Sequence, residues 1–186
     1  MEPSGGEPSE ALIREIAEEF PGFRLVPKRR SPLSRLIDLL LRAVTFGRQR
    51  SYMTRYRTVL GRTLYTPSRW DSTPDLDRLI VLRHERVHLR QRRRLTLPLM
   101  AFLYLVPFFP LGLAYGRARL EWEAYEETLR ATLELKGERA LRSRLLRERI
   151  VRRFTGPAYG WMWPFRRSVE RWYDRTLAEL SGGSRG

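Results

Sequence analysis

The sequence contains no cysteine and only two histidines among its 186 residues. The absence of cysteine excludes disulfides, cysteine-ligated zinc and thiol nucleophiles, and leaves His, Asp and Glu as metal ligands. It is also typical of proteins from a reducing compartment. Residues 1–10, MEPSGGEPSE, lack the basic and apolar regions of a signal peptide, so we expect a disordered tail and a cytoplasmic protein.

The composition predicts a folded, strongly basic protein. Hydrophobic residues make up 42% of the chain and charged residues 31%, and the length fits a single domain over residues 11–186. The net charge of +15 would attract anionic lipid headgroups or nucleic acid. A GC-rich coding sequence with solvated arginines explains the same charge, and both interpretations stay open. No DNA- or RNA-binding motif is recognisable, which argues against nucleic acid.

Hydrophobic periodicity predicts an α+β fold that is mostly helical, with a small antiparallel sheet. The apolar spacing and the flanking Pro and Gly residues favour helices over residues 11–20, 31–47, 74–93, 117–135, 138–154 and 166–180. Strands are expected over residues 23–27 and 56–67, the second bent at Gly61. Residues 138–186 form a basic, aromatic C-terminal part of the predicted domain.

Both histidines lie in one short stretch, VLRHERVHLRQ, inside the predicted helix 74–93. His84 and His88 are four residues apart and therefore point to the same side of a helix, where both imidazoles can reach one Zn²⁺ ion. Glu85 follows the first histidine, the position from which a carboxylate takes a proton from water. The alternative is an arginine-rich helix whose histidines cap a core or meet solvent.

A catalytic zinc ion needs a third protein ligand, and with the histidines used up this must be a carboxylate. The candidates lie in the predicted helix 117–135, which places Trp122, Tyr125 and other apolar residues on one stripe. Glu121 lies beside this stripe, on the side shared with Tyr125, Thr128 and Thr132. Glu126 lies at its far border, and Glu123, Glu127 and Glu134 lie on the face expected to be solvated. We therefore predict Glu121 as the third ligand.

The HERVH motif followed by a glutamate on a second helix resembles the gluzincin metallopeptidases. More narrowly, Glu121-Trp122-Glu123-Ala124-Tyr125 resembles the E-x-x-A-D ligand helix of the CAAX-processing and heat-shock membrane protease family and of the related antibiotic-sensor proteases. Tyr125 stands where that family has Asp, so the resemblance implies that Tyr125 or a water molecule orients a zinc-binding histidine. It implies a zinc metallopeptidase acting on a peptide or protein, with a sheet beside the two ligand helices.

The resemblance also suggests residues that bind the substrate. In zincins an edge strand beside the zinc helix pairs with an extended substrate, which would involve Leu60, Gly61, Leu64 and Tyr65; an ordinary sheet strand is the alternative. A stabiliser of the oxyanion is needed too. Tyr159 is the first candidate, and Tyr65 and Tyr125 are the others.

Residues 95–115 form an uncharged apolar insertion long enough to cross a bilayer. A single crossing would separate His88 from Glu121 by about 30 Å of hydrocarbon, which a shared zinc ion forbids. Pro98, Pro107 and Pro110 favour a broken path that returns to the same side. We expect either a buried internal segment or one that docks peripherally on the inner face of an anionic membrane.

Overall fold

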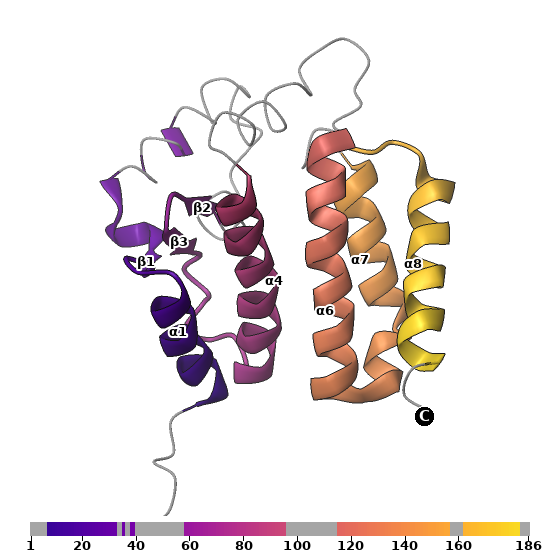
Figure 1. The fold of residues 1–186 in the computed structure, drawn as a ribbon, viewed down its shortest axis with the longest axis horizontal. Coiled ribbons are helices and arrows are strands. Elements are labelled where there is room, and N and C mark those ends of the chain that lie inside the picture. The colour runs from indigo at the N-terminus through magenta and orange to yellow at the C-terminus, as the bar shows by residue number, and fades with distance from the viewer. Residues whose placement is uncertain are drawn as a thin grey trace, which may run out of the picture. The chain divides into compact units, whose positions relative to one another are not determined.

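The computed structural model of this chain describes residues 7–32, 35, 38–39, 58–95, 115–156 and 162–182. The chain divides into two compact units, Met1–Leu82 and Arg83–Gly186, and the boundary falls inside helix α4 (Asp75–Arg94). Helices dominate and a single small sheet accompanies them in the described part, which confirms the mostly helical α+β class (Figure 1). The insertion 96–114, most of the expected helix 31–47 and Tyr159 lie outside the described residues.

The first unit combines helix α1 with the sheet and the start of α4. Besides the start of α4, its elements are α1 (Pro8–Glu19), β1 (Arg24–Pro27), the 3₁₀ turn η1 (Lys28–Arg30), β2 (Thr58–Leu60) and β3 (Thr63–Thr66). Helix α1 begins at Pro8, inside the segment expected to be a tail, because proline is well suited to the first turn of a helix. Leu12, Ile16, Leu64 and Leu82 are among the buried residues that form the core of this unit.

The sheet has the order β1-β3-β2 and is mixed. Strands β2 and β3 pair antiparallel as a hairpin, and β1 pairs parallel with β3. The expected single strand bent at Gly61 is therefore two strands. Gly61 lies in the turn between them with φ of 60°, in the left-handed region that glycine adopts at little cost. The expectation of an antiparallel sheet is correct for β2–β3 and wrong for β1–β3.

Helix α4 carries the histidine motif and follows its predicted bounds closely. Asp75 and Asp77 lie in its first turn and Arg92–Arg94 in its last, which suits the helix dipole. The hydroxyls of Ser72 and Thr73, just before the helix, donate to the carbonyl of Arg69. Leu76, in the first turn of α4, is 41% exposed.

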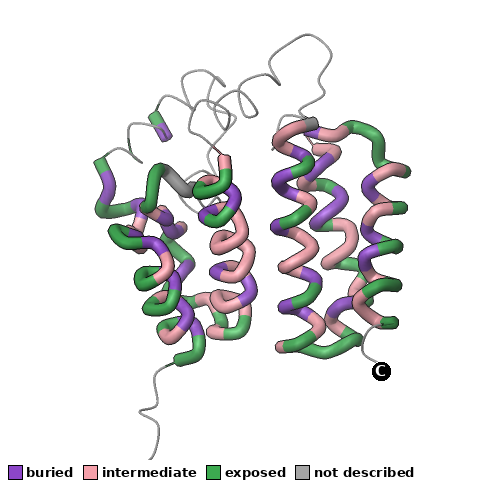
Figure 2. The backbone as a smooth tube through the Cα atoms, viewed as in Figure 1, coloured by how far each residue is buried: buried purple, intermediate pink, exposed green. Residues whose placement is uncertain are grey.

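The second unit contains three helices that lie side by side, α6 (Tyr115–Leu141), α7 (Arg144–Thr155) and α8 (Arg166–Gly182) (Figure 1). Buried and exposed residues alternate along each helix, as expected for amphipathic helices around a shared core (Figure 2). That core includes Leu129, Phe154, Met162 and Tyr173. Helix α6 continues past residue 135, where we expected it to end, and is kinked at Gly137, which has a φ of 77°. Helix α7 begins at Arg144 rather than at 138.

Among the described residues, no helix combines the length and the apolar character that crossing a membrane requires.

Candidate metal centre

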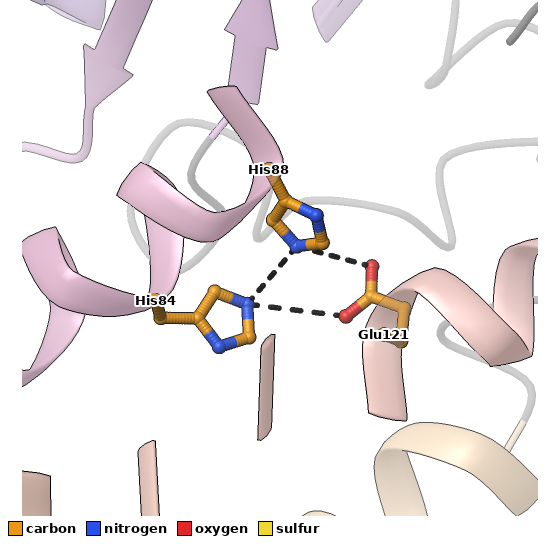
Figure 3. Close-up of side chains that lie close together, drawn as sticks. All are labelled: His84, His88 and Glu121. Atoms are coloured by element: carbon orange, nitrogen blue, oxygen red, sulfur yellow. Dashed lines mark hydrogen bonds and ion pairs between the residues drawn. The ribbon is translucent and has the colours of Figure 1, made fainter. Parts of the chain in front are cut away.

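Helix α4 presents both histidines on one side, one turn apart. Their Nε2 atoms are 3.2 Å from each other, and the side chains of His84 and His88 are 13% and 14% exposed (Figure 3). This follows from the helical repeat, which brings residues four positions apart into neighbouring places on the helix surface. The pair therefore offers two nitrogen atoms at a single place.

Glu121 of α6 brings a carboxylate to the same place. Its Oε2 lies 3.9 Å from His84 Nε2, its Oε1 lies 3.8 Å from His88 Nε2, and its side chain is 11% exposed (Figure 3). The two histidines and Glu121 form a group that could hold a metal ion, with ligand atoms within 4.8 Å of one another. The structure thus brings together the three residues that the sequence predicted as ligands, all of them in the unit Arg83–Gly186.

The proton on the His84 ring is assigned by its neighbour Thr128. The Thr128 hydroxyl donates its single hydrogen to the carbonyl of Ala124, at 3.1 Å. It lies 2.9 Å from His84 Nδ1 and must accept a hydrogen bond there. Nδ1 therefore carries the proton of the neutral ring, and the lone pair is on Nε2, the atom that lies toward His88 and Glu121.

The proton on the His88 ring is assigned by Gln91. The amide nitrogen of Gln91 donates to the carbonyl of Leu120 at 3.0 Å and to Oε2 of Glu123 at 2.9 Å. Its oxygen must then face His88 Nδ1, which lies 2.9 Å away and donates to it. His88 Nε2 is also left with a lone pair. Neither Gln91 nor Thr128 was predicted, although Gln91 is three residues from His88 and Thr128 lies on the side of the helix assigned to Glu121.

With both Nδ1 atoms protonated, the Nε2 atoms of the two neutral rings and the Glu121 carboxylate are all electron-pair donors. Two neutral Nε2 atoms cannot hydrogen bond to each other, and a carboxylate beside them adds only further acceptors. In tetrahedral zinc coordination with bonds of about 2.0–2.1 Å, two ligand atoms are about 3.4 Å apart. The nitrogen pair already has this spacing, and the carboxylate needs to approach by about 0.5 Å. Two imidazoles and a carboxylate fit a catalytic zinc ion, which keeps its fourth position open.

Ion pairs of Arg83 connect the start of the histidine motif to α6. Arg83, directly before His84, donates to Glu127 at 2.5 Å and also to Glu134. Burial disfavours its charge, but the hydrogen bonds to Glu134 and Glu127 outweigh this and raise the pKa of Arg83. Glu127 was expected on the solvated face; its side chain is only 18% exposed because Arg83 and Arg130 cover it.

The remaining predicted residues lie at different places. The Tyr125 ring packs edge-on against the His84 ring, with centroids 4.9 Å apart, so it contacts a ligand. The hydrogen-bond acceptor of His84 Nδ1, however, is the Thr128 hydroxyl. Glu85 is half-buried on α4, in the position directly after His84.

The predicted substrate strand lies in the first unit. Leu64 and Tyr65 belong to β3, which is paired on both edges, so an extended substrate would have to pair with β2 or β1 instead. Leu60 ends β2 and Gly61 forms the turn after it. A role of Leu60 and Gly61 in binding substrate stays a prediction.

A polar pocket of about 280 Å³ adjoins the candidate metal centre. Gln91, which bonds to His88, is also one of the residues that line this pocket. Arginines and glutamates supply most of the other lining residues: Arg90, Arg94, Arg130, Glu123, Glu126 and Glu127. Polar groups of a bound molecule would find donors and acceptors there.

Comparison of the chain with family models, with curated proteins and with solved structures finds no match. The resemblance to the gluzincins therefore rests on the motif residues and on their geometry.

Proposed function

We propose that this protein is a zinc-dependent hydrolase, and more narrowly a metallopeptidase. The observation that carries the proposal is the convergence of His84 Nε2, His88 Nε2 and the Glu121 carboxylate, while Thr128 and Gln91 lie within hydrogen-bond distance of the Nδ1 atoms of the two rings. A core-capping or solvated histidine pair gives no reason for three acceptors to meet at one place. A cation between them does.

The proposed mechanism gives separate roles to the metal ligands and to Glu85. His84, His88 and Glu121 hold the ion, which when bound supplies a Lewis acid that polarises a carbonyl and acidifies water. Glu85 accepts the proton of the attacking water and passes it to the leaving amine. Peptide as the substrate class comes from the resemblance to gluzincins, whereas the residues themselves support metal-assisted hydrolysis.

The test is hydrolysis of a quenched fluorescent peptide library by zinc-loaded protein and by its Glu85→Gln variant. We expect Glu85→Gln to keep zinc and to lose activity by about 10²- to 10⁴-fold, the usual contribution of a general base. Glu138→Gln is the matched control, since Glu138 is an exposed carboxylate on α6 that pairs with Arg142 of the same sequence neighbourhood and not with the histidine motif. Equal hydrolysis by Glu85→Gln and wild-type protein would exclude the proposed mechanism.

A second candidate function, binding to an anionic membrane surface, is favoured by the arginines of α8. Arg167, Arg171 and Arg175 are exposed and form no ion pair with any described residue. Their spacing of four places them on one face, in a stripe about 12 Å long. The neighbouring acids Glu148, Glu170 and Asp174 are already bound by Arg147 and Arg166.

Lipid is the better match for this stripe because the same unit exposes large apolar side chains. Leu145 is 77% exposed and Phe165 is 53% exposed. Such side chains insert between headgroups, while arginines attract the lipid charge at about 1 kcal/mol each. Replacing all three arginines of the stripe by alanine should therefore weaken membrane partitioning by about 100-fold.

Co-sedimentation with phosphatidylglycerol-containing vesicles measures this partitioning. The matched control is the triple alanine variant of Arg14, Arg119 and Arg139, which are likewise exposed and unpaired among the described residues, so that both variants lose the same charge. Equal loss in both variants, or no binding of wild-type protein at low salt, would contradict the membrane candidate. Binding to a polynucleotide but not to vesicles would identify nucleic acid instead.

A further inference from the structure

Gln91 links the two helices that carry the candidate ligands. It is only 4% exposed, although glutamine is a polar residue. Its oxygen accepts from His88 Nδ1 on its own helix α4. Its nitrogen donates to the carbonyl of Leu120 and to the carboxylate of Glu123, both on α6. A single side chain therefore contacts a ligand on one helix and the backbone of the other.

We infer that Gln91 is the positioning residue of the metal centre, an inference that rests on the proposed metal-binding function. Leu120 directly precedes Glu121, so the hydrogen bond from Gln91 fixes the ligand helix within one residue of the third ligand. The same amide orients the His88 ring and sets which nitrogen faces the ion. Gln91 thus fixes the position of His88 on α4 relative to Glu121 on α6. The ligand atoms are therefore already close together in the metal-free protein.

Only an amide side chain at position 91 can both accept a hydrogen bond from His88 and donate hydrogen bonds to α6. The acceptors Leu120 and Glu123 require a donor on one side, and the Nδ1 proton of His88 requires an acceptor on the other. A leucine would make none of these bonds. A glutamate would still accept from His88 but would direct an oxygen at two acceptors, in a place where a buried unpaired polar group is costly.

The orientation of His88 separates a positioning role from a merely structural one. Because the chain has only two histidines, the side-chain ¹⁵N spectrum of the metal-free, tag-free protein contains two rings and is easily assigned. We expect wild-type protein to show the Nδ1-protonated tautomer at both rings. Gln91→Leu should give a mixture of tautomers at His88 alone, whereas Gln91→Glu should keep the Nδ1-protonated form because its carboxylate accepts the hydrogen bond from Nδ1.

Zinc affinity, measured by chelator competition on the same proteins, tests the consequence for the metal. We expect Gln91→Leu to bind zinc about 10- to 100-fold more weakly, the usual effect of losing the partner of a ligating histidine. Glu126→Gln is the control, because Glu126 lines the neighbouring pocket and pairs with Arg130 but contacts no ligand in the described structure. It should bind zinc like the wild type.

The outcomes distinguish this inference from the proposed function. Wild-type zinc affinity in Gln91→Leu, with a single Nδ1-protonated tautomer at His88, overturns the role of Gln91 and leaves the metal site standing. A wild-type protein that binds no zinc overturns the proposed function, and the metal-free tautomer measurement then still decides whether Gln91 orients the His88 ring. If Gln91→Leu does not fold, the Gln91→Glu variant decides. Loss of the Nδ1-protonated tautomer of His88 in folded Gln91→Glu protein overturns the inference.

Discussion

Removing the Thr128 hydroxyl tests the assignment of the His84 ring. Thr128→Val keeps the shape and nearly the helix propensity of the side chain but deletes the acceptor of the His84 Nδ1 proton. A net hydrogen bond contributes about 0.5–1.5 kcal/mol, and a buried donor left without a partner costs about 1–3 kcal/mol. Because the His84 side chain is 13% exposed and water reaches it in part, we expect a loss of about 1–2 kcal/mol in the metal-free protein.

Thr132→Val is a closely matched control for this substitution. Thr132 lies one turn further along α6, and its hydroxyl donates to the carbonyl of Thr128 just as that of Thr128 donates to Ala124. Both variants lose a hydroxyl bonded to its own helix, and in the described structure only Thr128 contacts a histidine. Any difference between them therefore measures the contact with His84.

Urea unfolding and chelator competition supply the two readouts. Thr128→Val should unfold at lower urea than Thr132→Val and should bind zinc about 10- to 100-fold more weakly, while Thr132→Val keeps the wild-type affinity. If both variants show equal stability and equal zinc affinity, the hydroxyl of Thr128 does not orient the His84 ring and does not determine which ring nitrogen carries the proton.

Further predictions concern zinc, Lys28 and Tyr173. Zinc at about 100 times its dissociation constant should stabilise the wild type by about 2.7 kcal/mol and raise its Tm by about 5–11 °C in calorimetry, with no rise in His88→Ala. Burial lowers the pKa of Lys28 from 10.5 to about 8. The unfolded chain therefore binds more protons between these values, so the free energy of unfolding should rise with pH across that interval, and Lys28→Met should remove this rise in urea titrations. Tyr173→Phe deletes a buried hydrogen bond to the carbonyl of Leu141 and should cost about 1 kcal/mol, measured by the same unfolding assay.

The parts of the site that follow local rules could be predicted from the sequence. Spacing by four on a helix is enough to place His84 beside His88, and the apolar stripe of the next helix is enough to select Glu121 among its neighbours. Pro74 indicates where α4 begins, because proline is favoured in the first turn of a helix. In each case the signal lies within one helix.

The parts of the site and of the fold that depend on contacts between two helices or two strands could not be predicted. Gln91 has no local signal beyond its distance from His88, because its partners Leu120 and Glu123 lie on another helix. Glu127 was assigned to the solvated face because the sequence does not show that Arg83 would cover it. The parallel pairing of β1 with β3 likewise depends on how the chain returns, which no pattern within either strand encodes.

The most direct measurement is the zinc stoichiometry of tag-free protein by equilibrium dialysis, with iron and manganese assayed in parallel. The account predicts one zinc per chain in the wild type, and loss of that zinc in both His88→Ala and Glu121→Ala. Absence of any tightly held metal, or equal zinc in the wild type and in these variants, would mean that the two imidazoles and the carboxylate meet around a shared proton rather than around a metal ion.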